Sequence, residues 1–374
     1  MIRIWLYLRC TQQHATFMNS RFAGPWLSAS RTLCLAIGLA HYALPAFAAE
    51  EAVLNLYSAR HYATDEALYD NFTRATGIKI NRVDADDAGI LARLKAEGAA
   101  SPADAILLVD AARLWKGEID DLFAPVKSEV LLKAVPEQWR AKLRPEGTRW
   151  FGLSTRARLI VYDKQKIKED EVDSYEKLAD PKHAGRLCTR SGSHPYNLSL
   201  FGAMMEHLGA PATEVWLKGL VANMARTPKG GDTDQIKGVA SGECGIALAN
   251  SYYLARLYRS DSAQDKAIVE RIGVVFPNQS TWGTHMNIAG GAVARHAKHP
   301  ENALKFLTYL VSEQAQMYFA DGNNEWPVVK GLSLNNPALK AMGGASFKSE
   351  TLPASLIGMN QIKVQQMLDR VGFR

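Results

Sequence analysis

Two adjacent tyrosines, Tyr252 and Tyr253, stand where a short apolar strand is expected to give way to a helix. Strand-to-helix junctions at the edge of an open α/β sheet are common ligand-binding positions. Phenol oxygens are hard, anionic donors when ionised, which suits a highly charged cation such as Fe(III). Adjacent tyrosines are also ordinary core filling, because aromatic side chains bury much apolar surface. The pair alone therefore leaves a metal site and a packed core open.

Three further residues occupy similar positions. His61 and Tyr62 follow the first predicted strand, and Tyr196 lies at the predicted start of a helix. If the strands are parallel, their carboxyl ends share one edge of a sheet, where one imidazole and four phenols would converge. Free tyrosine has a pKa near 10, so a phenolate at neutral pH requires a strong local cation. This donor set contains no thiolate, which argues against copper or zinc.

Alternating strands and helices are predicted to carry these residues. The expected strands are 53–57, 79–83, 105–109, 158–162, the segment around Cys188, the segment before Tyr252, 272–277 and 285–294. The expected helices are 65–76, 90–97, 196–208, 214–223, 234–239, 300–319 and 361–371. This alternation favours parallel βαβ units. The loop after the first strand lacks a glycine-rich phosphate fingerprint, which argues against a dinucleotide-dependent enzyme.

Residues 1–48 have the pattern of a secretory signal peptide with cleavage near Ala48. They contain four arginines and no acidic residue, then an apolar run over 33–40, then the small-x-small sequence Ala46-Phe47-Ala48. The apolar run is too short to span a bilayer as a stable helix. A retained anchor is the alternative, and translation could start at Met1 or at Met18. We expect an exported, periplasmic mature chain.

Charge and cysteine content change once this leader is removed. The whole chain carries 44 basic and 38 acidic residues, and losing four arginines leaves 40 and 38, a net charge of +2. No basic stripe with interleaved aromatic residues is present, so nucleic acid is not an expected partner. Cys188 and Cys244 remain of the four cysteines. In an oxidising compartment they predict either a disulfide or two buried free thiols.

The mature length of about 326 residues exceeds what one hydrophobic core usually supports, so two α/β lobes are expected. We place one lobe at 49–155 plus about 279–329, and the other at about 156–278 plus 330–374. A cleft between two such lobes is the usual place for a ligand.

Six motifs, in this order, resemble the periplasmic ferric iron-binding proteins, which are substrate-binding components of bacterial Fe(III) ABC importers. The motifs are 55–62, 101–104, 110–115, 193–199, 249–253 and 276–279, and they cover essentially the whole mature chain. The resemblance implies a bilobal type II periplasmic binding protein fold, similar to one lobe of transferrin. It also implies a monomer that is not an enzyme, and partnership with an inner-membrane permease and its ATPase.

Carried over motif by motif, the resemblance implies Tyr62, Tyr196, Tyr252 and Tyr253 as phenolate ligands of transported Fe(III), with His61 as a further candidate. Four phenolates around Fe(III) leave one excess negative charge, for which Arg156 and Arg256 are the family-matched cations. A carbonate or similar anion could bind near the helix that follows Ser191-Gly192-Ser193. Five protein ligands would make that anion unnecessary, so we do not expect it to be obligatory.

Two other functions stay open from the sequence. The same fold could bind another solute, such as a polyamine, an oxyanion or an organic iron chelate, because a fold does not fix its ligand. An exported hydrolase is the second alternative. The sequence contains no Gly-x-Ser-x-Gly elbow, no His-Glu-x-x-His motif and no evident Ser/His/Asp arrangement.

Overall fold

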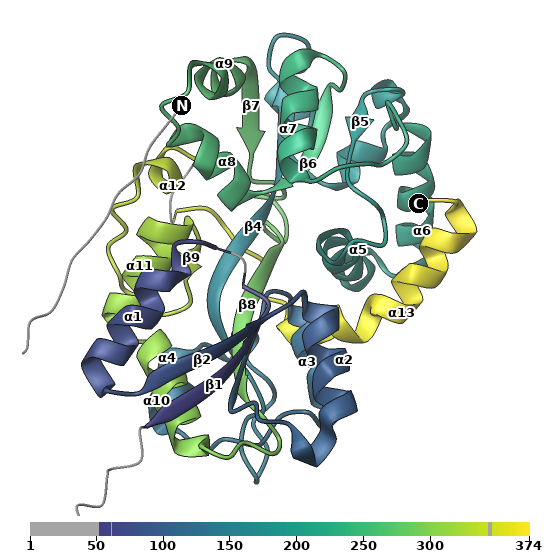
Figure 1. Cartoon of the computed structure of the whole chain (residues 1–374). Coiled ribbons are helices and arrows are strands. Elements are labelled where there is room, and N and C mark those ends of the chain that lie inside the picture. Colours follow the sequence, from purple (N-terminus) through teal and green to yellow (C-terminus); the bar gives the residue numbers. More distant parts are fainter. Residues whose placement is uncertain (1–51, 61, 343–345) are drawn as a thin grey trace, which may run out of the picture. The chain divides into compact units, whose positions relative to one another are not determined.

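A nine-stranded mixed sheet organises the part of the chain that the computed structural model describes, residues 52–60, 62–342 and 346–374 (Figure 1). The predicted signal peptide and His61 lie outside these described residues. The strand order is β2-β1-β3-β8-β4-β6-β5, and β7 and β9 both pair with β4. The strands are β1 (Val53–Ser58), β2 (Lys79–Asp84), β3 (Ala105–Leu108), β4 (Phe151–Asp163), β5 (Leu187–Cys188), β6 (Ile246–Asn250), β7 (Ile272–Val275), β8 (Met286–Val293) and β9 (Trp326–Pro327).

Strand β4 connects the two ends of this sheet. Its first part, from Phe151 to Ala157, pairs with β8, whereas Arg158 to Tyr162 pair with β6. All 13 of its residues are buried. A continuous buried strand of this kind fixes the direction in which both ends of the sheet present their loops.

The prediction of parallel βαβ units is confirmed at the two ends of the sheet and wrong in its middle. Strand β1 is parallel to β2 and β3, and β5 is parallel to β6. The central strand β8 is antiparallel to both β3 and β4, and β4 is antiparallel to β6. The junctions that follow β1, β5 and β6 carry the candidate tyrosines.

The helices follow most of the predicted boundaries. They are α1 (Asp65–Thr76), α2 (Asp87–Glu97), α3 (Ala111–Ile119), α4 (Glu129–Ala134), α5 (Pro195–Leu208), α6 (Ala210–Ala222), α7 (Asp232–Ser241), α8 (Ser251–Tyr258), α9 (Ala263–Arg271), α10 (Pro300–Leu310), α11 (Glu313–Asn323), α12 (Pro337–Ala341) and α13 (Ala354–Val371). Helix α1 ends as predicted at Gly77, whose φ of 72° is a left-handed conformation that glycine adopts without strain.

Two helix predictions were wrong. The helix expected over 300–319 is two helices, because Ser312 begins α11 with a side-chain cap on the Ala315 N–H, at 3.4 Å. The Ser312 backbone is extended, with ψ of 154°, as is typical of an N-cap residue, so α10 does not continue through it. The final helix was expected from 361 but begins at Ala354, directly after Pro353. Proline favours such a start, because it cannot donate an N–H to a preceding turn.

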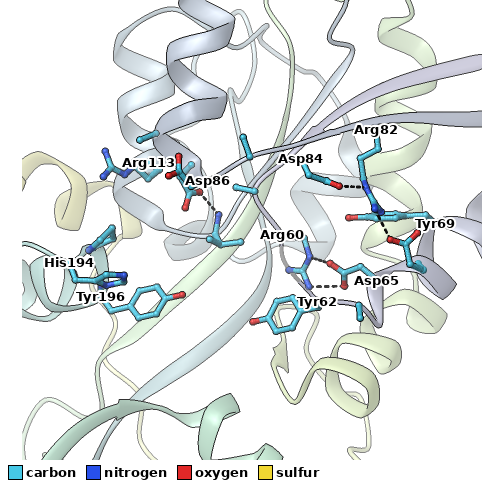
Figure 2. Close-up of a pocket in the computed structure, with 18 residues that line it drawn as sticks. Arg60, Tyr62, Asp65, Tyr69, Arg82, Asp84, Asp86, Arg113, His194 and Tyr196 are labelled. Atoms are coloured by element: carbon cyan, nitrogen blue, oxygen red, sulfur yellow. Dashed lines mark hydrogen bonds and ion pairs between the residues drawn. The ribbon is translucent and has the colours of Figure 1, made fainter. Parts of the chain in front are cut away.

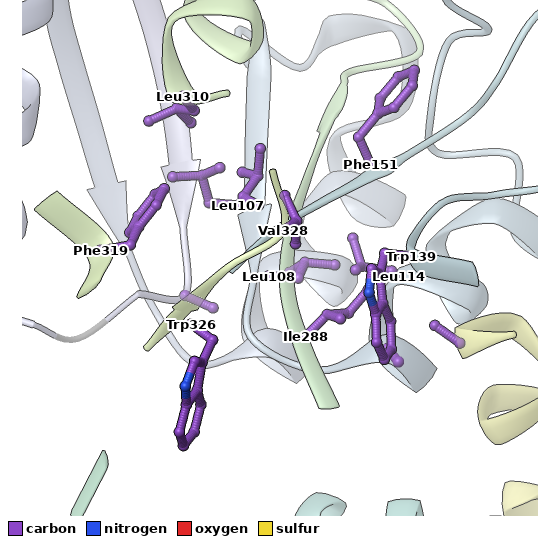
Figure 3. Packing of buried hydrophobic residues seen from close by; sticks show 14 of the residues in the cluster. Leu107, Leu108, Leu114, Trp139, Phe151, Ile288, Leu310, Phe319, Trp326 and Val328 are labelled. Carbon is purple, nitrogen blue, oxygen red and sulfur yellow. The ribbon is translucent and has the colours of Figure 1, made fainter. Parts of the chain in front are cut away.

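The core follows from the period-two alternation of the strands. On β4, Leu159 and Val161 join the larger hydrophobic cluster, whereas Ile160 and Tyr162 join the smaller one. The larger cluster also packs the helices around β1, β3 and β8, including the side chains in Figure 3. The smaller cluster packs α5, α6 and α13 on the opposite face of β4 and β6. Burial on both faces explains why β6 is almost wholly apolar, whereas β4 also carries buried polar side chains, among them Arg156 and Arg158.

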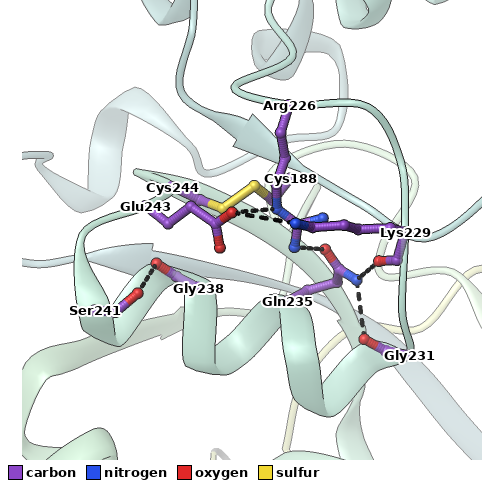
Figure 4. Close-up of a disulfide and its surroundings, with 9 residues drawn as sticks. All are labelled: Cys188, Arg226, Lys229, Gly231, Gln235, Gly238, Ser241, Glu243 and Cys244. Atoms are coloured by element: carbon purple, nitrogen blue, oxygen red, sulfur yellow. Dashed lines mark hydrogen bonds and ion pairs between the residues drawn. A yellow bond between two sulfur atoms is a disulfide. The ribbon is translucent and has the colours of Figure 1, made fainter.

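Cys188 and Cys244 form a disulfide, which decides between the two predicted outcomes (Figure 4). Their Cα atoms lie 5.8 Å apart, a normal separation for a disulfide. The bond joins the end of β5 to the turn that precedes β6. Among the described residues, no helix has the length and apolar character needed to cross a membrane.

Candidate functional site

Tyr62 lies in the loop between β1 and α1, with 8% of its surface exposed. Its hydroxyl donates a hydrogen bond to Oε1 of Glu325, at 3.1 Å. The neighbouring Arg60 pairs with the Asp65 carboxylate at 2.6 Å and with Glu325 at 3.3 Å. Because Asp65 is the first residue of α1, these contacts fix the loop against the helix that follows it.

Tyr196 is the second residue of α5, directly after Pro195. The His194 Nδ1 accepts a hydrogen bond from the Tyr196 N–H at 3.2 Å and so caps the helix. Burial, together with nearby arginine charges led by Arg190, lowers the pKa of His194 to about 3. The imidazole is therefore neutral at physiological pH, as an accepting cap must be. Proline at the first helical position reinforces this start.

Tyr252 and Tyr253 lie in the first turn of α8, which begins immediately after β6. Tyr252 is fully buried, and its ring centroid lies 4.2 Å from that of Tyr253. The Tyr252 hydroxyl is 3.0 Å from the Tyr196 hydroxyl. Its ring also contacts Tyr62 edge to face, with centroids 5.6 Å apart.

The structure thus brings the four predicted tyrosines into one group, which we call the tyrosine cluster (Tyr62, Tyr196, Tyr252 and Tyr253). Figure 2 shows Tyr62 and Tyr196 directing their hydroxyls toward one another from opposite sides of a cavity. Three chain segments supply the group: the loop after β1, the start of α5 and the start of α8. In the described ranges, no group of three or more His, Cys, Asp or Glu side chains is arranged to hold a metal ion.

Comparisons with known proteins agree with this architecture. Residues 67–344 match the model for the family described as bacterial extracellular solute-binding protein. Iron uptake protein A1 of Synechocystis sp. is 45% identical over 87% of this chain and 88% of its own. The Fe(3+)-binding periplasmic protein of Serratia marcescens is 27% identical over 84% of this chain and 88% of its own.

Solved structures are similar over the same region. A Trichodesmium protein in complex with iron and citrate ligands has a TM-score of 0.81 at 45% identity, covering 86% of this chain and 100% of its own. The ferric binding protein from Campylobacter jejuni has a TM-score of 0.79 at 34% identity, with 86% and 100% covered. The chain belongs to the periplasmic ferric iron-binding family of bacterial extracellular solute-binding proteins. The predicted bilobal periplasmic binding protein fold is therefore confirmed.

Four arginines surround the tyrosine cluster of this family member. The Arg256 guanidinium lies 5.3 Å from the ring centroids of Tyr62 and Tyr252, and 5.6 Å from that of Tyr253. Buried Arg156 lies 5.4 Å from the Tyr196 ring. The structure therefore places both arginines named from the sequence beside the cluster. Such distances allow cation–π attraction, and the same charges would stabilise phenolates.

Arg60 and Arg190 are cations that the sequence reasoning missed. Arg60 lies 4.9 Å from the Tyr62 ring and Arg190 lies 5.0 Å from the Tyr196 ring. Each arginine is close in sequence to the tyrosine that it contacts, and this proximity is the signal from which the contact could have been predicted. Glu325 was also missed. It is fully buried and 263 positions from Tyr62, so no local pattern links the two residues.

Burial governs the protonation of the tyrosine cluster. It raises the pKa of Tyr62 well above the usual value near 10, and the Glu325 carboxylate raises it further. Burial likewise raises the pKa of Tyr252, with the Tyr196 and Tyr62 side chains as the next causes. The pKa of Tyr196 is raised by burial despite the opposing charge of Arg156. In the metal-free protein these three phenols hold their protons at neutral pH.

The cavity in Figure 2 has a volume of about 820 Å³, far more than a single metal ion occupies. Tyr62 and Tyr196 both line it. Its other lining residues include alanines and several charged groups, among them Arg82, Asp84 and Arg113. His194, which caps α5, also lines the cavity.

A hydrogen-bonded chain of Ser199, His285 and Glu350 bears on the hydrolase alternative. Ser199 Oγ lies 2.8 Å from His285 Nε2, and His285 Nδ1 contacts the Glu350 carboxylate. No local sequence pattern marks this arrangement, because the three residues are far apart along the polypeptide. All three are essentially fully buried, and Asn287 already donates to Ser199 Oγ at 2.7 Å. A nucleophile must reach its substrate, so this chain has the character of a structural network.

Proposed function

We propose that this protein captures Fe(III) in the periplasm and delivers it to an ABC permease and its ATPase for iron uptake. The observation that carries the proposal is the tyrosine cluster, in which phenols from three chain segments meet beside four arginines. Relatives named for iron uptake and for Fe(3+) binding support the choice of metal. Capture and delivery require no catalytic group, so we propose a carrier, not an enzyme.

Tyr62, Tyr196, Tyr252 and Tyr253 are the proposed ligands of Fe(III), with His61 a further candidate from the same loop as Tyr62. Phenolate oxygen suits Fe(III) better than it suits divalent ions, since the higher charge gains more from anionic donors. Arg156 and Arg256 would offset the excess negative charge of four phenolates. We do not expect a carbonate or similar anion to be obligatory.

The mechanism we propose is closure of two lobes around the ion. One lobe would comprise 49–155 plus about 279–329, and the other about 156–278 plus 330–374, after removal of a signal peptide over 1–48. Tyr62 lies in the first of these lobes and the other three tyrosines in the second, so closure would complete the site. Hinged closure around a ligand is common in periplasmic binding proteins. The closed, monomeric form would then be what the permease recognises.

Titration of the metal-free protein with Fe(III) and with Fe(II), followed by visible absorption, tests this proposal. Fe(III) should produce a phenolate-to-iron charge-transfer band at one equivalent, and Fe(II) should not. Tyr252→Phe and Tyr253→Phe should each weaken Fe(III) binding sharply while circular dichroism stays unchanged. Unchanged iron binding in both variants would refute the ligand assignment.

A second candidate function follows from the size of the cavity. A space of about 820 Å³ could admit an organic iron chelate or another solute beside the tyrosine cluster. The Trichodesmium relative was solved with iron and citrate ligands, which supports the same idea. Equilibrium dialysis with doubly labelled ferric citrate separates the candidates. Retention of iron alone favours capture of the ion, and retention of both labels in equal amounts favours the chelate.

A further inference from the structure

Arg158 is a fully buried cation at the point where β4 changes partner from β8 to β6. Only 2% of its surface is exposed. Its Nη1 donates to Asp232 Oδ2 at 2.6 Å and to Asn250 Oδ1 at 3.1 Å, and its Nη2 donates to Asn197 Oδ1 at 2.8 Å. One planar guanidinium therefore joins three chain segments, a geometry that a lysine ammonium reproduces poorly.

The partners of Arg158 are close neighbours of the site tyrosines in the sequence. Asn197 follows Tyr196 in the first turn of α5, and Asn250 lies two residues before Tyr252. Asp232, at the start of α7, strengthens the link because its Oδ2 also accepts the Asn250 N–H at 2.7 Å. Arg158 thus holds the two segments that begin with these tyrosines against a single group.

Asn197 also connects Arg158 to the loop that precedes α5. Its Nδ2 donates to Thr189 Oγ1 and to the carbonyl oxygens of Arg190 and Ser191, at 3.0 to 3.1 Å. This support matters because β5 contains only two residues, Leu187 and Cys188, and pairs with β6 through those two alone. Strand pairing that short cannot by itself set the position of a helix that starts seven residues later.

Arg156 lies over the Tyr196 ring and Arg256 over the Tyr252 ring, so each of these cations contacts a ring of the pair. Arg158 is bonded to both segments at once.

We propose that Arg158 is a positioning residue that holds Tyr196 and Tyr252 at the spacing needed to bind one metal ion from two sides. This inference rests on the proposed function for its consequence in iron binding. The geometric part, that Arg158 sets the separation of the two hydroxyls, stands independently of any metal. Arg158 and its three partners would keep Tyr196 and Tyr252 in place before Tyr62 binds the metal.

Arg158→Met is the direct test, with Arg271→Met as a matched control. Arg271 pairs with Asp163 at 2.9 Å, at the far end of the same strand, and touches no neighbour of a site tyrosine. Loss of a group that orients metal ligands typically weakens metal binding by about 10- to 100-fold. We expect that loss of Fe(III) affinity in Arg158→Met, a smaller loss in Arg158→Lys and none in the control.

Combining variants distinguishes positioning from general destabilisation. In the double variant Arg158→Met/Tyr196→Phe, the loss of Fe(III) binding free energy should be smaller than the sum of the two single losses, because Arg158 acts through Tyr196. In the double variant Arg158→Met/Tyr62→Phe, the loss of Fe(III) binding free energy should equal the sum of the two single losses. Removing one partner of a buried ion pair can unfold a protein. Asn250→Ala keeps the Arg158–Asp232 pair and serves if Arg158→Met does not fold, with a weaker loss of affinity expected.

Crystal structures of the metal-free variants provide the deciding measurement. The two hydroxyl oxygens should separate beyond hydrogen-bond distance in Arg158→Met, or in Asn250→Ala, and stay near 3.0 Å in Arg271→Met. A separation that stays near 3.0 Å in the first two variants overturns the inference. If the wild-type protein binds no Fe(III), the proposed function fails, and these structures still decide whether Arg158 positions the pair.

Discussion

The two sides of the tyrosine cluster are held in opposite ways. On the Tyr62 side (Tyr62, Arg60 and Glu325), the phenol donates to a buried carboxylate at 3.1 Å, an acceptor that opposes ionisation of the phenol. On the tyrosine-pair side (Tyr196, Tyr252 and Arg158), two phenols lie 3.0 Å apart and their segments are bonded to a buried cation. A carboxylate therefore opposes ionisation of Tyr62, whereas the segments that carry Tyr196 and Tyr252 share hydrogen bonds to one buried guanidinium.

The largest expected effect is on the pH dependence of Fe(III) binding. Burial raises the pKa of Tyr62, Tyr196 and Tyr252 above neutral pH in the metal-free protein. Each phenol must lose its proton to bind iron as a phenolate, so affinity rises with pH up to those raised pKa values. The expected change is about tenfold per pH unit for each proton released.

Competition against a chelator of known affinity between pH 5.5 and 8 measures this slope. Replacing Tyr196 and Tyr252 together by phenylalanine should remove about twice the slope that Tyr62→Phe removes, because the pair supplies two protons and Tyr62 supplies one. Affinity that does not change with pH would contradict proton release from the cluster.

The second prediction compares single tyrosines from the two sides. Tyr196→Phe should weaken Fe(III) binding by about 100-fold or more, beyond the usual cost of losing a group that only orients a ligand. Tyr62→Phe should cost less, about tenfold, since Tyr62 must give up its hydrogen bond to Glu325 when it binds metal. Tyr69→Phe, in the same cavity, should leave binding unchanged. Equal losses of affinity in Tyr196→Phe and Tyr62→Phe would show that the hydrogen bond to Glu325 does not affect Fe(III) binding.

Sequence reasoning located the tyrosines because local patterns mark them. Tyr62, Tyr196 and Tyr252 each lie at a strand-to-helix junction, and the structure brings these junctions together. Their roles as iron ligands stay a prediction. The bilobal α/β fold was also predictable, since strand and helix periodicities alternate along the chain.

The groups that hold the tyrosines could not be found in the same way. Glu325 lies 263 positions from Tyr62, and Asp232 lies 74 positions from Arg158. Partners so distant meet only through the folded topology, and a charged residue in a sequence is most often a surface group. The break between α10 and α11 was missed for a different reason, because apolar residues continue on both sides of Ser312.

Glu325→Gln tests the Tyr62 side directly and should have an effect of opposite sign. Removing the carboxylate charge removes one cause of the raised pKa of Tyr62, so phenolate formation becomes easier. Fe(III) affinity should therefore rise several-fold, whereas Arg158→Met lowers it. Arg60 keeps its pair with Asp65 at 2.6 Å, which limits the loss of stability. A fall in affinity on chelator competition would mean that Glu325 supports metal binding.

The smallest expected effect on affinity comes from the Cys188–Cys244 disulfide, which lies on the tyrosine-pair side. Its cysteines are 56 positions apart, so its loss should cost about 3 to 4 kcal/mol through the larger freedom of the unfolded chain. In Cys188→Ala/Cys244→Ala, the melting temperature should fall by about 4 to 6 °C by calorimetry. Fe(III) affinity should change less than about threefold, because the hydrogen bonds of Arg158 to Asn197 and Asn250 stay in place. A loss of affinity as large as that of Arg158→Met would instead show that the disulfide sets the spacing of Tyr196 and Tyr252. The tyrosine-pair side would then differ from the Tyr62 side because a covalent bond, and not the Arg158 hydrogen bonds, positions its phenols.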